Sequence, residues 1–99
     1  MARREPATRE AAEMLAVQAF AYLAGDPDRL GRFLALTGIG PARIRAAAAE
    51  PGFFAGVLDH IMSDEALVQE FADRAGVDPA TVAQARRILG GPAWEREAP

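Results

Sequence analysis

Hydrophobic residues recur along this chain three or four positions apart in six stretches, and glycine and proline residues separate the stretches. That spacing is typical of helices, and no stretch shows the sustained alternation of a half-buried strand. The pattern therefore predicts an all-α fold, a compact bundle of five or six short helices forming one domain over residues 7–91. Residues 1–6 and 92–99 are predicted to be flexible tails. The predicted helices cover residues 7–24, 27–37, 41–49, 51–62, 64–75 and 79–89.

Gly, Asp and Pro residues mark the ends of these helices. Gly25 precedes Asp26-Pro27, and "GIGP" (Gly38 to Pro41) and "GVDP" (Gly76 to Pro79) look like two versions of one joint. Glycine ends a helix in the left-handed conformation without a Cβ penalty. Aspartate caps the next helix, and proline at its first position gives up no hydrogen bond. Each joint therefore predicts a helix end followed by a helix start.

The first predicted helix is apolar around most of its circumference. Ala12, Leu15, Ala16, Ala19 and Leu23 share one face, whereas Met14, Val17 and Ala21 occupy another. A helix that is apolar on all sides is usually buried on several of them, so we expect residues 7–24 to be the central helix. In the other helices the spacing predicts these core residues: Leu30, Phe33, Leu34, Thr37, Phe54, Val57, Leu58, Ile61, Leu67, Val68, Phe71, Val82, Ala85, Ile88 and Leu89.

Composition favours a soluble cytoplasmic protein. The chain has 99 residues, of which 51% are hydrophobic and 25% charged, and it has no cysteine. No run approaches the roughly 20 apolar residues of a membrane helix. Without cysteine there is no disulfide framework and no thiolate metal site. We expect no cofactor, no bound metal and no membrane partner.

The segment "LTGIGPARIR", residues 36–45, resembles a helix-hairpin-helix turn that grips a DNA backbone. In such a turn Gly38 and Gly40 would present backbone N–H groups to a phosphate, and Arg43 and Arg45 would add charge. Phosphate binding needs a strongly positive face. Residues 1–50, however, carry seven Arg against six acidic residues, a balance of only +1. The segment is therefore interpreted first as a joint between helices.

A second nucleic-acid candidate is the segment 71–89, which resembles a helix-turn-helix. Gln84, Arg86 and Arg87 are its plausible groove contacts. Residues 51–99 carry four Arg against eight acidic residues, a balance of −4, which disfavours approach to a polyanion. The segment is therefore interpreted first as a helix-turn-helix-like hairpin that serves packing alone.

Catalytic residues are not evident. The single histidine, His60, lies beside Asp59 and near Ser63 and Asp64. Triads are assembled from separated positions, and adjacent residues on a helix point away from each other. We therefore expect no enzyme activity.

Trp94, the only tryptophan, follows a Gly-Gly-Pro sequence in the C-terminal tail. It either folds back onto the bundle or contacts a partner, because tryptophan is enriched at interface hot spots. Trp94 is the one residue that the sequence offers as a candidate partner contact.

The chain as a whole resembles a functionally uncharacterised bacterial family of all-helical proteins of about 100 residues. The similarity spans residues 10–91 and rests on "AAEMLAVQAFAYLAGDP", on the block from "LGRFLALTGIGP" to "FADRAGVDP", and on "VAQARRILGG". The resemblance implies a helical fold in the bacterial cytoplasm and supplies no activity.

These observations favour a small accessory module that binds another protein chain and is a monomer or a weak homodimer. Nucleic-acid binding through residues 71–89 or 38–45 is the alternative.

Overall fold

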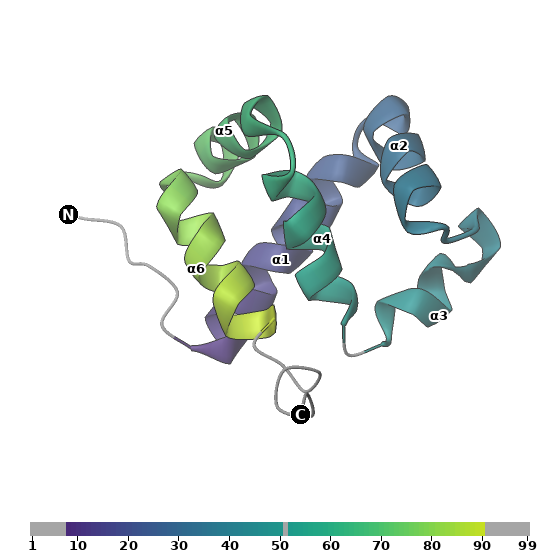
Figure 1. Ribbon diagram of the computed structural model, residues 1–99, viewed down its shortest axis with the longest axis horizontal. Helices are drawn as coiled ribbons and strands as arrows, with labels where there is room; N and C mark the ends of the chain where they lie inside the picture. The colour runs from purple at the N-terminus through teal and green to yellow at the C-terminus, as the bar shows by residue number, and fades with distance from the viewer. Residues whose placement is uncertain (1–7, 51, 91–99) are drawn as a thin grey trace.

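The computed structural model describes residues 8–50 and 52–90, and these ranges contain helices and turns but no strand (Figure 1). The predicted all-α class is therefore confirmed. The elements are α1 (Arg9–Ala24), α2 (Pro27–Thr37), the 3-10 turn η1 (Pro41–Arg43), α3 (Ile44–Ala48), α4 (Phe53–Met62), α5 (Glu65–Ala75) and α6 (Pro79–Gly90). The bounds of α2 are those predicted, and the stretch predicted as one helix over 41–49 divides into η1 and α3.

Asp side chains cap the starts of α2 and α5, and glycines end α2 and α5 in the predicted left-handed conformation, whereas Gly25 at the end of α1 is right-handed with φ −74°. The Asp26 carboxylate accepts the Asp28 backbone N–H at 2.9 Å, and Asp64 accepts those of Ala66 and Leu67 at 2.9 and 3.2 Å. Gly38 and Gly76 have φ values of +78° and +73°, the left-handed region in which a Cβ is unfavourable. The choice of Gly at these two positions thus follows from the backbone conformation.

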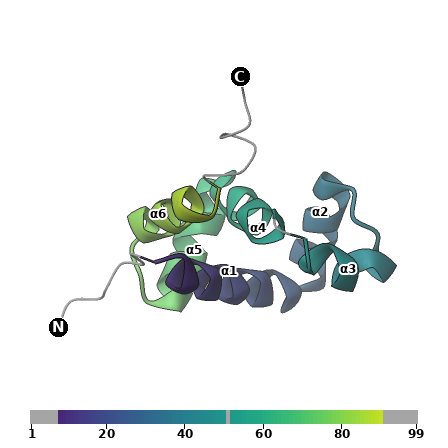
Figure 2. The same ribbon diagram turned by 90° about the horizontal axis from the view of Figure 1, so that it is seen from below.

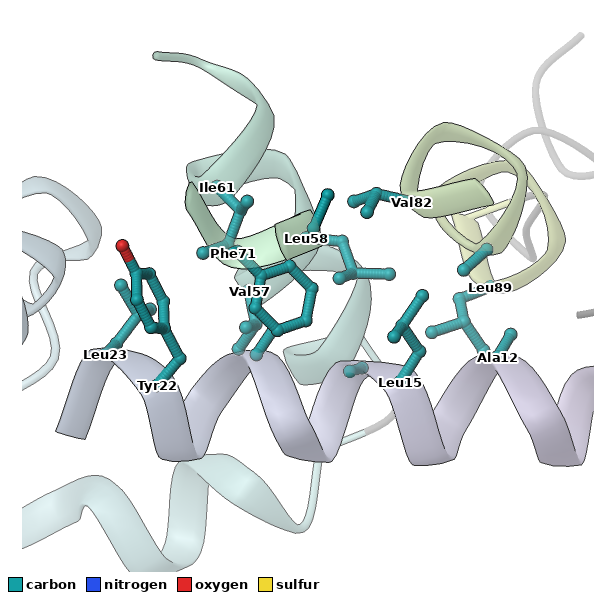
Figure 3. Packing of buried hydrophobic residues seen from close by; sticks show 14 of the residues in the cluster. Ala12, Leu15, Tyr22, Leu23, Val57, Leu58, Ile61, Phe71, Val82 and Leu89 are labelled. Atoms are coloured by element: carbon teal, nitrogen blue, oxygen red, sulfur yellow. The ribbon is translucent and has the colours of Figure 1, made fainter. Parts of the chain in front are cut away.

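Helix α1 is the central element, since it contacts α2, α4, α5 and α6. In Figure 3 its labelled core side chains all point to one side, toward residues of α4, α5 and α6. Ala12, Ala16 and Ala19 have no exposed surface, and such small side chains let neighbouring helices approach closely. The remaining buried apolar residues are Leu15, Tyr22, Leu23, Phe33, Phe53, Val57, Leu58, Ile61, Phe71, Ala72, Val82, Ala85 and Leu89.

The second apolar face of α1 is not buried, which corrects the expectation that this helix would be buried on several sides. Met14 and Val17 expose 62% and 52% of their surface, and Ala21 is exposed as well. Figure 2 shows why: α4 and α6 lie on the same side of α1, so the described helices leave its opposite side open. Leu15 and Leu23, by contrast, are buried as predicted.

Two smaller corrections concern α2 and α4. Thr37 was expected in the core but is exposed, and its Oγ1 donates a hydrogen bond to the Phe33 carbonyl at 2.8 Å. A hydroxyl that bonds its own helix in this way needs no place in the core. Phe53, the first residue of α4, is buried although it was not predicted to be, because its ring packs edge-on against Phe20 and Phe33.

Helices α5 and α6 form a hairpin that packs into the bundle, as the preferred interpretation of residues 71–89 predicts. The two helices contact each other and both contact α1 and α4. The Val77 N–H donates to the Ala72 carbonyl at 3.0 Å across the left-handed Gly76, which closes the turn. The hairpin is thus an integral part of the core packing.

Candidate functional site

The exposed side of α1 carries an apolar stripe formed by Met14, Val17, Ala21 and Ala24. These residues are spaced three or four positions apart and all are exposed, so they lie on one face of the helix. We call them the α1 stripe. Glu10 continues the same face toward the N-terminus of the helix. Gln18, which is also exposed, borders the stripe.

A shallow groove of about 290 Å³ adjoins the stripe. It is lined by Gln18, Ala21, Tyr22, Phe71, Arg74 and Ala75 and lies between α1 and α5. We call it the α1–α5 groove. Ala21 belongs to both features, so the stripe and the groove form one continuous surface.

A polar network fixes one wall of the groove. The Tyr22 hydroxyl donates to the Glu70 carboxylate at 2.7 Å, and Arg29 donates to the same carboxylate oxygen at 2.9 Å and to Asp26 at 3.0 Å. The Arg29 and Arg74 guanidinium carbons lie 4.7 and 5.5 Å from the centre of the Tyr22 ring. These contacts join α1, α2 and α5, and they hold Tyr22 in place.

The same network shifts two pKa values. Burial raises the pKa of Tyr22, and its hydrogen bond to Glu70 raises it further. The Tyr22 hydrogen bond, followed by the charge of Arg29, lowers the pKa of Glu70. Both shifts favour the neutral phenol and the ionised carboxylate, which is the pair of protonation states that the hydrogen bond requires.

His60 lies in a second cleft, of about 280 Å³, lined by Arg32, Leu36, Ser63, Asp64 and neighbouring residues. Its ring packs edge-on against Phe33 with centroids 5.2 Å apart. Burial and then the charge of Arg32 lower the pKa of His60. The Ser63 hydroxyl donates to the backbone carbonyl of His60 at 2.7 Å and not to its ring. The described residues thus do not form a serine–histidine pair here.

The residues proposed for phosphate contact in the Gly-Ile-Gly turn are only partly brought together. Gly38 and Arg43 line a cleft of about 350 Å³ that also includes Glu50 and Phe53. The Gly38 N–H already donates to the Leu34 carbonyl at 2.9 Å, and the Ile39 N–H donates to the Thr37 hydroxyl at 3.4 Å. The turn therefore uses these N–H groups internally, as a joint does. Gly40 precedes η1, and Arg45 is exposed on α3.

The proposed groove contacts of the hairpin lie elsewhere. Arg86 donates from Nε and Nη2 to the Asp59 carboxylate at 2.6 and 3.1 Å, Gln84 is half-buried, and Arg87 is exposed. Helices α3 and α6 lie at opposite ends of the molecule in Figure 1, so the four arginines do not form one basic patch. Trp94, the candidate partner contact, lies outside the described residues.

The described residues show neither a membrane-spanning helix nor a cluster of metal ligands. Over residues 8–50 and 52–90, no helix is long and apolar enough to cross a membrane. In the same ranges no three His, Asp or Glu side chains gather as metal ligands would.

Comparison with known proteins gives a family. No curated protein and no solved structure matches the chain. A family described as "Protein of unknown function (DUF3572)" matches residues 9–92, and this range includes every described helix. The predicted resemblance to a helical family without an assigned activity is thereby confirmed, and the chain belongs to the DUF3572 family.

Proposed function

We propose that this chain is a non-enzymatic accessory module of the bacterial cytoplasm that binds another protein chain through the α1 stripe and the α1–α5 groove. The observation that carries the proposal is the exposure of Met14 and Val17 side by side on the one open face of the central helix. Single exposed apolar residues are ordinary. Here, two large ones continue into alanines and a groove whose lining mixes apolar and polar side chains, which is the composition of a contact surface.

The exposed area of Met14 and Val17 sets the free energy that their burial against a partner would contribute. Fully burying a Met or Val side chain contributes about 1.5–3 kcal/mol. Because both side chains are already partly covered, covering the rest contributes about half of that amount each, or roughly 1.5–3 kcal/mol for the pair. This gain suits a reversible contact more than a permanent one.

Photo-crosslinking in cells tests the proposal. A photoreactive amino acid is placed at Val17 in one variant and at Leu36 in a control, because Leu36 is equally apolar, 67% exposed and on α2. We expect adducts with a protein chain from position 17, their loss when Met14→Glu is added, and far fewer adducts from position 36. Equal yields from the two positions, or yields insensitive to Met14→Glu, would contradict the proposal.

A further inference from the structure

The α1 stripe is uneven along its length. Its large side chains, Met14 and Val17, lie in the N-terminal half, and its small ones, Ala21 and Ala24, lie in the C-terminal half. Met14 and Ala21 are separated by seven positions, which is about two helical turns or ~10 Å along the axis and nearly the same direction around it. The α1–α5 groove opens beside Ala21. The open face of α1 therefore carries a ridge, formed by Met14 and Val17, and the α1–α5 groove. The two lie about 10 Å apart along the helix axis.

This arrangement is complementary to itself. When two copies of a helix face each other antiparallel, a two-fold axis near Val17 and Gln18 exchanges positions at equal distances from it. Met14 of one copy then comes opposite Ala21 of the other, beside the groove. We propose, on the basis of the function proposed above, that the bound partner is a second copy of this chain, arranged antiparallel with Met14 of each copy in the α1–α5 groove of the other.

A parallel arrangement fits less well. It would place Met14 against Met14 and Ala21 against Ala21, so the large side chains would collide while the grooves stayed empty.

The charges on this surface also favour the antiparallel arrangement. Glu10 lies at one end of the face, and Arg74 lines the groove in its other half. Antiparallel pairing brings these opposite charges toward each other, and parallel pairing brings like charges together.

The contact is small, which sets its strength. A helix of 16 residues is about 24 Å long and about 10–12 Å wide, so its footprint is on the order of 250–300 Å². Stable interfaces bury about 800 Å² on each partner. We therefore expect a reversible dimer with a Kd on the order of 100 µM.

Analytical ultracentrifugation of the full chain from about 20 µM to about 2 mM, a range chosen to bracket that Kd, tests the dimer. We expect the average mass of the wild type to rise toward that of a dimer. Met14→Glu, which charges the ridge, and Ala21→Leu, which fills the groove, should remain monomeric. The control Leu36→Glu removes an equally exposed apolar residue from α2 and should associate as the wild type does. Because all three positions are exposed, circular dichroism should show an unchanged fold. A wild type that stays monomeric, or three variants that behave alike, would overturn the inference.

Disulfide trapping tests the orientation, since the chain has no native cysteine. Disulfides form only where the two Cα atoms lie within about 7 Å. A mixture of Met14→Cys and Ala21→Cys chains should give the mixed 14–21 dimer in preference to the 14–14 and 21–21 dimers. The reverse preference would contradict the antiparallel arrangement.

The Val17 crosslinking experiment separates this inference from the proposed function. Adducts with other proteins only would refute pairing with a second copy and leave the proposed function standing. Yields of adducts equal to those at Leu36 would refute both.

Discussion

Placing the same substitution on the two faces of α1 gives the sharpest test of how this helix packs. Ala16 has no exposed surface and belongs to the core, whereas Ala21 is exposed on the α1 stripe. Replacing Ala16 with Leu adds three carbon atoms where no space is open to solvent. Overpacking of this kind costs about 1–3 kcal/mol. Ala21→Leu meets no such barrier and should change the free energy of unfolding by less than about 0.5 kcal/mol.

The expected effect is large relative to the stability of so small a domain. A chain of this length typically has a free energy of unfolding of roughly 5–15 kcal/mol. Each kcal/mol shifts the midpoint of thermal unfolding by about 4–8 °C in domains of this size, so Ala16→Leu should lower it by roughly 5–20 °C. Urea and thermal unfolding followed by circular dichroism, with a few µM of protein to avoid association, would measure both variants. Equal losses of stability for the two variants would refute the assignment of the open and closed faces.

Three further predictions concern the joints, the histidine and nucleic acid. Gly31→Ala, in mid-helix with open space around it, should raise the free energy of unfolding by about 0.5–1 kcal/mol. Gly38→Ala, at φ +78°, should lower it by about 1–2 kcal/mol; urea unfolding that ranks the two the other way would contradict the capping argument. Because the folded-state pKa of His60 lies below its usual 6.5, the unfolded chain binds the proton more readily, so stability should be full above that value and fall as the pH drops through it. Urea unfolding between about pH 7.5 and pH 5 should show this slope reduced in His60→Gln, and an unchanged slope would count against it. Fluorescence anisotropy of a labelled random duplex should show no binding even at low salt, because Arg86 is paired with Asp59 and α3 lies far from α6; salt-sensitive binding lost on mutation of the arginines would reverse this conclusion.

Much of the fold follows from local sequence signals. Gly38 and Gly76 adopt the left-handed conformation that their position at the predicted joints implies, and Asp26 and Asp64 cap the helices that they precede. These features depend on a few neighbouring residues, so they can be predicted without knowing the rest of the structure. The core faces of α4 and α6, with Leu58 and Val82, follow from helical periodicity in the same way.

The open face of α1 could not be predicted from periodicity. Met14 and Leu15 are both large, apolar and in the same helix, and only the positions of α4 and α6 decide that Leu15 is buried and Met14 exposed. Those positions depend on the whole set of helix contacts. The Tyr22–Glu70 hydrogen bond joins residues 48 positions apart and is likewise set by tertiary packing. The α1–α5 groove, with Arg74 on its wall, exists only because of that packing.

An NMR dilution series tests the central claim, that the open side of α1 is the surface through which this chain pairs with a second copy of itself, most directly. Backbone amide spectra of the full chain would be compared between about 20 µM and about 2 mM, on either side of the expected Kd. The account predicts shift changes centred on Met14, Val17 and Ala21 and on the adjoining end of α5 near Arg74, with the amides of α3 and of Leu36 unchanged. Spectra that do not change with concentration, or changes centred on Arg43 and Arg45, would contradict it.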